Sequence, residues 1–96
     1  MAYDKLFLMK YSVNSDVATW RVLDGEAVII NNQTSYYYSL NRTGTFVWNL
    51  LIDNEMTLDE IVENVSSSYE LEGDEIRGDI TAILDNLYNE KLLERK

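Results

Sequence analysis

The residues that could carry chemistry in this chain are carboxylates and tyrosines, because the sequence contains no histidine and no cysteine. This absence excludes imidazole acid–base catalysis, thiolate nucleophiles and the nitrogen and sulfur ligands of most zinc sites. The carboxylates fall on the polar faces of predicted helices, where solvation is the default, and their spacing indicates no acid–base pair. The composition therefore favours a binding protein over an enzyme, with no cofactor and no metal ion.

Three consecutive tyrosines, Tyr36, Tyr37 and Tyr38, are the clearest candidates for binding. A tyrosine combines a large apolar ring with a hydrogen-bonding hydroxyl, which is favoured at interfaces. Strand alternation places Tyr36 and Tyr38 on one face and Tyr37 on the other. Leu40 shares the first face, so we expect that face to look towards the helices and Tyr36 to be the best groove candidate. A core position for Tyr38 and an ordinary surface position for Tyr37 are the alternatives.

The tyrosines belong to the last of three predicted strands. Residues 17–23 are rich in β-branched and aromatic side chains, Asp24-Gly25 is a strong hairpin signal, and residues 26–30 are the predicted return strand. A polar turn at 31–34 leads into the third strand, 35–40. Short turns between successive strands predict an antiparallel meander with the third strand at one edge.

Three helices are predicted after the strands. Asn41 is the expected N-cap of the first, which ends near residues 53–55. Thr57 and Glu60 have the spacing of a capping box at the start of the second. The third begins near residues 72–75, where carboxylates suit the positive end of the helix dipole. The predicted fold class is α+β and winged helix-turn-helix-like, with a three-stranded antiparallel sheet followed by three helices.

The length of 96 residues indicates one small domain. We expect an N-terminal arm at residues 1–15 and a folded domain at residues 16–96. The arm is predicted to be an irregular segment that packs Leu6 and Leu8 onto the domain. An extra strand or a dimer contact is the alternative.

The charge limits the kinds of partner. Acidic residues number 17 and basic residues 8, which gives a net charge of -9. Nucleic-acid phosphates and anionic membrane surfaces are repelled by such a protein. The longest apolar runs fall well short of the roughly 20 residues that span a bilayer, and no signal peptide is recognisable. We therefore expect a cytoplasmic protein that binds neither nucleic acid nor membrane.

The ordered set of motifs resembles the PqqD-like family, named for coenzyme PQQ synthesis protein D and also called RiPP recognition elements. The resemblance covers roughly residues 17–93 and is closer to the lasso-peptide and general RiPP branch than to PQQ synthesis. The Tyr-Tyr-Ser-Leu-Asn block followed by Thr-Gly and Trp is its most specific part. The matching stretches are residues 20–28, residues 37–41, Thr43-Gly44, Trp48, Thr57, residues 60–62, Tyr69, Asp79-Ile80, Leu84, Leu87 and Leu92.

The resemblance implies a non-catalytic adaptor that binds the leader segment of a ribosomally made precursor peptide and presents it to a modifying enzyme or leader peptidase. In this family the leader adds as an antiparallel strand to the exposed edge of the third strand. Its side chains then enter a groove beside the third helix. The third strand here lacks the Pro, Lys and Glu residues that usually protect an edge. A winged-helix regulatory or DNA-associated module is the alternative, and a monomer or weak homodimer is expected.

The expected peptide-binding residues come from the third strand and the third helix. They are Ser35, Tyr36, Tyr37, Tyr38, Ser39, Ile76, Arg77, Asp79, Ile80, Ile83, Leu84 and Leu87. Ile80 and Leu84 are favoured for the groove floor, whereas core positions are the alternative for Ile83 and Leu87. A positive group such as Arg77 could steer an acidic leader, but the net charge of -9 would oppose one. Two explanations of this conflict are open: the leader is basic or neutral, or the negative surface faces an enzyme partner.

Overall fold

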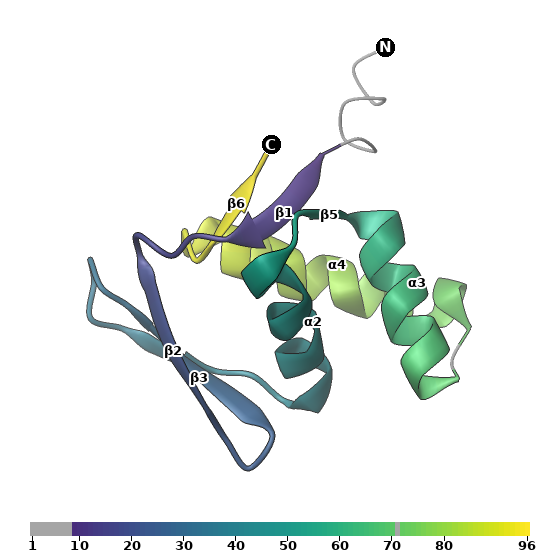
Figure 1. Ribbon diagram of the computed structural model, residues 1–96, viewed down its shortest axis with the longest axis horizontal. Helices are drawn as coiled ribbons and strands as arrows, with labels where there is room; N and C mark the ends of the chain where they lie inside the picture. The colour runs from purple at the N-terminus through teal and green to yellow at the C-terminus, as the bar shows by residue number, and fades with distance from the viewer. Residues whose placement is uncertain (1–8, 71) are drawn as a thin grey trace.

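Two small antiparallel sheets lie beside three helices in the part of the chain that the structure describes, residues 9–70 and 72–96 (Figure 1). The structure is a computed structural model. The elements are β1 (Lys10–Val13), β2 (Ala18–Leu23), β3 (Glu26–Asn31), β4 (Tyr37–Ser39), α2 (Arg42–Asp53), β5 (Met56–Thr57), α3 (Leu58–Tyr69), α4 (Gly73–Asn89) and β6 (Leu93–Arg95). The predicted fold class is confirmed, because an antiparallel β2-β3-β4 sheet precedes the three helices.

The β2–β3 hairpin has the tight turn that its sequence predicts. Leu23 pairs with Glu26, so Asp24 and Gly25 alone form the loop. Both have positive φ, 54° and 80° respectively. A two-residue loop with this backbone matches the right-handed twist of the flanking strands and holds them in register.

The third strand is shorter than the predicted 35–40, since β4 begins at Tyr37. Ser35 has a φ of 66°, in the left-handed region, and its N–H donates to the Asn31 carbonyl. The Asn31 side-chain oxygen also accepts from the backbone N–H groups of Gln33 and Thr34. These local bonds hold the chain in a turn through Ser35, so an extended strand cannot start until the turn is complete.

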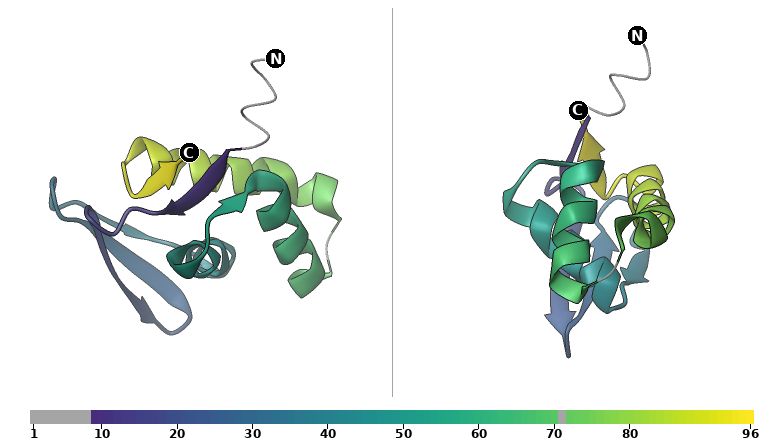
Figure 2. Two further views of the ribbon diagram at one scale, coloured as in Figure 1. Left: turned by 45° about the horizontal axis from the view of Figure 1, so that its top comes forward. Right: turned by 90° about the vertical axis from the view of Figure 1, so that its right-hand side faces the viewer.

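The second sheet has the order β5-β1-β6 and brings the N-terminal part of the described chain beside the C-terminus (Figure 2). β1 is its central strand, with Tyr11 opposite both Met56 and Arg95. The prediction of an irregular arm is therefore wrong for residues 10–13, and the extra strand is what forms. Leu6 and Leu8 lie outside the described residues.

The helix starts follow the predicted caps. The Asn41 side chain accepts from the Gly44 N–H at 2.9 Å. Thr57 Oγ1 accepts from the Glu60 N–H at 3.2 Å, while the Thr57 N–H donates to Glu60 Oε1 at 2.9 Å, which completes the capping box. Each cap satisfies N–H groups that the first helical turn leaves without a carbonyl.

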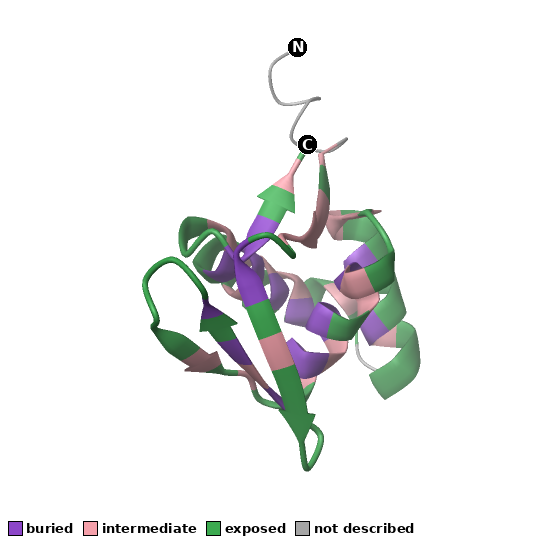
Figure 3. Ribbon diagram, turned by 60° about the vertical axis from the view of Figure 1, so that its left-hand side comes forward, coloured by how far each residue is buried: buried purple, intermediate pink, exposed green. Residues whose placement is uncertain are grey.

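The core lies between the meander sheet and the helices. Along β3 the buried residues Ala27, Ile29 and Asn31 alternate with more exposed ones, so one face of the sheet is covered (Figure 3). Trp48 of α2 is fully buried and meets Trp20 edge to face, with ring centroids 5.5 Å apart. The apolar area removed from water by this packing is the main favourable contribution to folding.

Candidate functional site

The outer edge of β4 is open. Tyr36 and Leu40 direct their backbone groups to β3, because the Asn31 N–H donates to the Tyr36 carbonyl and the Leu40 N–H donates to the Ala27 carbonyl, both at 2.8 Å. In an antiparallel pair the alternate residues point the other way. The N–H and C=O groups of Tyr37 and Ser39 therefore face outwards, and no strand of the described chain pairs with them.

β1 does not cover this edge. Lys10–Val13 pairs with β5 and β6 instead. β4 therefore remains the last strand of the β2-β3-β4 sheet. Exposed edges of this kind accept an additional strand readily.

A groove adjoins the open edge. It has a volume of about 430 Å³ and lies between β4 and the C-terminal half of α4. We call it the β4–α4 groove. Its lining residues are Tyr38, Ser39, Leu40, Ile83, Asn86, Leu87, Asn89 and Glu90. The four helix residues Ile83, Asn86, Leu87 and Glu90 follow the i, i+3, i+4, i+7 spacing of one helix face.

Two of the three consecutive tyrosines stand outside this groove. Tyr36 is 68% exposed and Tyr37 is 71% exposed, and neither lines it. Tyr37 shares the outer face of the sheet with Ile30, its cross-strand partner. Tyr38 is half-buried, packs against the core and lines the groove. The part of Tyr36 and Tyr37 in peptide binding stays a prediction.

The helix residues divide between groove and core. Ile83 and Leu87 line the groove, and Leu87 is at the same time a buried core residue with 4% of its surface exposed. Ile76, Ile80 and Leu84 are buried core residues that do not line it, and Ile80 and Leu84 have 0% and 1% of their surface exposed. Their part in peptide binding stays a prediction. Because Leu84 is a core residue, a charge placed there would disturb the fold as well as any bound peptide.

The two charged helix residues of the predicted set also lie away from the groove lining. Arg77 makes an ion pair with Asp59 of α3, with 2.7 Å between Nη2 and Oδ1. The Arg77 guanidinium therefore lies beside α3. Asp79 is exposed and does not line the groove.

Leu40, Asn86, Asn89 and Glu90 are lining residues that sequence reasoning missed. Tyr38 donates its hydroxyl proton to Glu90 Oε2 at 2.6 Å, a bond that runs from β4 to the end of α4. This bond, with burial and the nearby negative charge, raises the pKa of Tyr38 above its usual value. Spacing from Ile83 to Glu90 was the sequence signal that could have identified this face.

Asn31 holds the backbone at the same point. It is 2% exposed, and its side-chain N–H donates to the Glu90 carbonyl at 2.9 Å. The Glu90 main chain and side chain are thus each tied to the meander sheet. The C-terminus of α4 is fixed relative to β4 by these two bonds.

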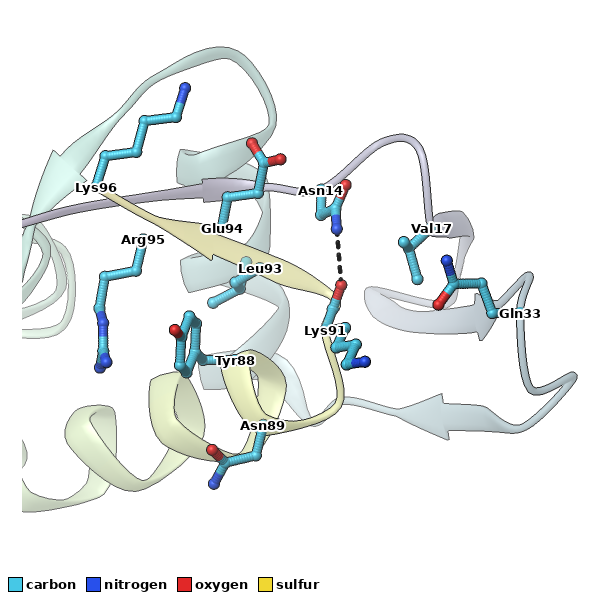
Figure 4. A pocket seen from close by; sticks show the side chains of 10 residues that line it. All are labelled: Asn14, Val17, Gln33, Tyr88, Asn89, Lys91, Leu93, Glu94, Arg95 and Lys96. Atoms are coloured by element: carbon cyan, nitrogen blue, oxygen red, sulfur yellow. Dashed lines mark hydrogen bonds between the residues drawn. The ribbon is translucent and has the colours of Figure 1, made fainter.

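A second hollow, of about 630 Å³, lies beside β6 (Figure 4). Lys91, Arg95 and Lys96 contribute to its lining, and the Arg95 guanidinium carbon lies 4.0 Å from the centre of the Tyr88 ring. Of its lining residues, only Asn89 also lines the β4–α4 groove. The basic residues at the C-terminus therefore gather at a different place from the open edge.

Within residues 9–70 and 72–96 no group of three or more acidic side chains could hold a metal ion. None of the described helices has both the length and the apolar composition needed to cross a membrane.

Comparison with known proteins finds one family model and one solved structure that this chain is similar to. A family model described as "Coenzyme PQQ synthesis protein D (PqqD)" matches residues 26–93. A solved structure, "TbiB1 in Complex with the TbiA(beta) Leader Peptide", is similar, with a TM-score of 0.77 and 28% sequence identity. The match covers 86% of this chain and 94% of that one. Among curated proteins, no match is found.

Proposed function

Because the chain belongs to the PqqD family, we propose that it captures the leader segment of a ribosomally made precursor peptide and presents it to a modifying enzyme or leader peptidase. The observation that carries the proposal is the open edge of β4 beside the β4–α4 groove. The leader adds as an antiparallel strand to that edge. The similarity to TbiB1, solved in complex with a leader peptide, supports leader-peptide binding. The chemistry belongs to the partner enzyme.

The backbone and the groove have separate roles in this proposal. The outward N–H and C=O groups of Tyr37 and Ser39 offer backbone hydrogen bonds to a leader of any sequence. At a net ~0.5–1.5 kcal/mol each, such bonds supply a few kcal/mol, and ordering the leader offsets much of this. The groove must therefore provide the remaining affinity and the sequence selectivity, because alternate side chains of an added strand point into it.

The regulatory or DNA-associated alternative has no support. α3 contains no lysine or arginine, and α4 contains Arg77 alone. Arg77 is paired with Asp59. Helices of this composition cannot neutralise several phosphates, which is the main source of nucleic-acid affinity.

The proposal is tested with proline at the open edge. Peptides that bind the wild-type protein are selected from a random display library, and synthetic copies are titrated by fluorescence polarisation. Ser39→Pro removes an outward N–H without removing a bond to β3. We expect it to weaken binding by about two- to tenfold, the equivalent of one lost hydrogen bond. A clash between the proline ring and the peptide would weaken binding further. Ser39→Ala keeps the N–H and should bind nearly as the wild type does.

Thermal melting of each variant checks that it is folded, so that a change in affinity reflects peptide binding and not loss of the fold. Tyr37→Pro, with Tyr37→Ala as its control, blocks the neighbouring outward N–H and provides an independent measurement. Equal affinity of the wild type and both folded proline variants would contradict strand addition at β4. A library that yields no binding peptide at all would contradict the proposed function.

A further inference from the structure

Glu90 places a fixed carboxylate at the β4–α4 groove. Its Oε2 accepts from the Tyr38 hydroxyl at 2.6 Å, and its carbonyl accepts from the buried Asn31 side chain at 2.9 Å. The Glu90 side chain is otherwise exposed and lines the groove. A carboxylate has lone pairs for several hydrogen bonds, so the bond from Tyr38 leaves acceptor capacity at Oε1. The bond from Tyr38 orients the carboxylate without saturating it.

Within the described part of the chain, no cationic side chain lines this groove. The lining residues comprise one carboxylate, two side chains with hydroxyl groups, two amides and three aliphatic side chains, without Lys or Arg. In the described chain Arg77 pairs with Asp59, while Lys91, Arg95 and Lys96 line the hollow beside β6. Glu90 therefore has no cationic partner among the residues that line the groove, in a protein whose net charge is already -9.

The strand register brings a bound peptide to this carboxylate. Cross-strand neighbours in an antiparallel sheet share a face, as Tyr38 does with its partner Ile29 on β3. A peptide residue added opposite Tyr38 on the open edge points to the same face, towards α4. Its side chain then lies beside the Tyr38 ring and within reach of Glu90, while Ile83 and Leu87 offer apolar contact to the neighbouring inward positions.

We infer that the peptide segment which occupies the β4–α4 groove carries a lysine or arginine among its inward-facing apolar residues, and that Glu90 binds this side chain. The inference rests on the proposed function and adds the chemical class of the segment. Glu90 acts as the specificity residue, and Tyr38 and Asn31 act as positioning residues. An acidic residue at the same peptide position meets the like charge of Glu90 and is disfavoured, which resolves the conflict that the net charge poses for an acidic leader.

The test compares peptide selection on matched variants. A random peptide display library is selected on the wild type, on Glu90→Gln and on Asp85→Asn. Glu90→Gln removes the charge but keeps an oxygen that can accept from Tyr38. Asp85→Asn makes the same change of net charge at an exposed α4 residue that does not line the groove. Synthetic peptides with Lys or Gln at the enriched position are then titrated at low and high salt.

The expected result is an enrichment of Lys or Arg at one inward position on the wild type and on Asp85→Asn, and its loss on Glu90→Gln. The Lys peptide should bind the wild type about two- to fivefold more tightly than the Gln peptide, as expected of a partly exposed ion pair. High salt should reduce this ratio towards one. On Glu90→Lys the position should instead favour Asp or Glu.

Three outcomes would overturn the inference. Peptides whose binding is weakened by Ser39→Pro but which show no basic preference would refute it and leave the proposed function standing. A basic preference that persists on Glu90→Gln, or that disappears equally on Asp85→Asn, would show that Glu90 is not the binding residue. Failure to select any peptide that depends on β4 would overturn the inference together with the function on which it rests.

Discussion

Trp48 shows how one residue can both stabilise the fold and carry an uncompensated cost. It is the largest fully buried side chain, and its indole N–H has no hydrogen-bond partner among the described residues. The ring contributes a large apolar surface and an edge-to-face contact with Trp20. Leaving a buried N–H unpaired costs about 1–3 kcal/mol.

We predict that Trp48→Ala destabilises the protein by about 3–5 kcal/mol, because truncation of a buried aromatic leaves a cavity. Trp48→Phe should cost clearly less, since it keeps an aromatic ring and removes the unpaired N–H. Urea unfolding of the three proteins measures both free energies. Equal losses for the two variants, or a melting shift of a degree or two for Trp48→Ala, would contradict this view of the site.

The contact between Asn31 and Glu90 is a feature that residue types alone do not predict. A polar turn at residues 31–34 was predicted from its composition. The structure adds that Asn31 is buried and reaches across the fold to the Glu90 carbonyl. That contact joins residues 59 positions apart, so no local pattern contains it.

At the scale of single elements, the capping box of α3 is the clearest agreement between pattern and structure. The Thr57 N–H donates to the Glu60 carboxylate and the Glu60 N–H donates to the Thr57 hydroxyl. The pKa of Glu60 is lowered below its usual value of 4.5. The largest cause is the hydrogen bond with the Thr57 backbone, and the second is the hydrogen bond with the Thr57 side chain. Favouring the ionised form in this way contributes stability above the unfolded-state pKa.

The sign of this contribution gives a test by pH. The stability that Glu60 contributes through its charge is present at neutral pH and is lost as the pH falls through its lowered pKa. We predict that the difference in unfolding free energy between the wild type and Glu60→Ala is larger at pH 7 than at pH 3. Chemical denaturation at both values measures it. Glu63→Ala is the matched control, because it also removes an exposed carboxylate from α3. The prediction would be contradicted if the difference in unfolding free energy between the wild type and Glu60→Ala were larger at pH 3 than at pH 7.

α4 illustrates why an element can be predicted while its orientation is not. Its apolar stripe was recognised from Ile76, Ile80, Ile83, Leu84 and Leu87. The structure buries Ile80, Leu84 and Leu87 in the core, and Leu87 also lines the groove beside β4 together with the partly buried Ile83. A helical stripe this wide can face two neighbours, and which residues face each neighbour depends on where α2, α3 and the sheet lie.

At the scale of the whole molecule, β1 joins the two ends of the described chain. Lys10 and Lys96 exchange two backbone hydrogen bonds, with distances of 2.7 and 2.9 Å. Asn14 donates to Leu92 in the same ladder, so by alternation Ser12 directs its N–H to β6, opposite Glu94. As the central strand, β1 has partners on both sides and cannot accommodate a proline easily.

We predict that Ser12→Pro lowers the melting temperature by at least ~4 °C, because it removes a hydrogen bond of about 1 kcal/mol and a domain of this size loses about 4–8 °C per kcal/mol. Ser12→Ala keeps the N–H and should melt close to the wild type. Circular dichroism measures both. A proline variant as stable as the alanine variant would show that residues 10–13 are dispensable to the fold.

The sequence alone determined the features that depend on near neighbours, and these agree with the structure. They are the Asp24-Gly25 turn, the caps at Asn41 and Thr57, and the order of the meander and the three helices. The family resemblance is confirmed as well. Each of these signals lies within a few residues or follows chain order, where backbone sterics and local hydrogen bonds decide the outcome.

Tertiary structure alone decided the pairing of β1 with β5 and β6 and the hydrogen bond between Tyr38 and Glu90. Strands as short as β5 and β6 have no reliable pattern of their own, since their backbone groups are satisfied only when a distant partner arrives. The β4–α4 groove is likewise a feature that tertiary structure decides. It exists because the rotation of α4 and the end of β4 are set together by the packing of one shared core.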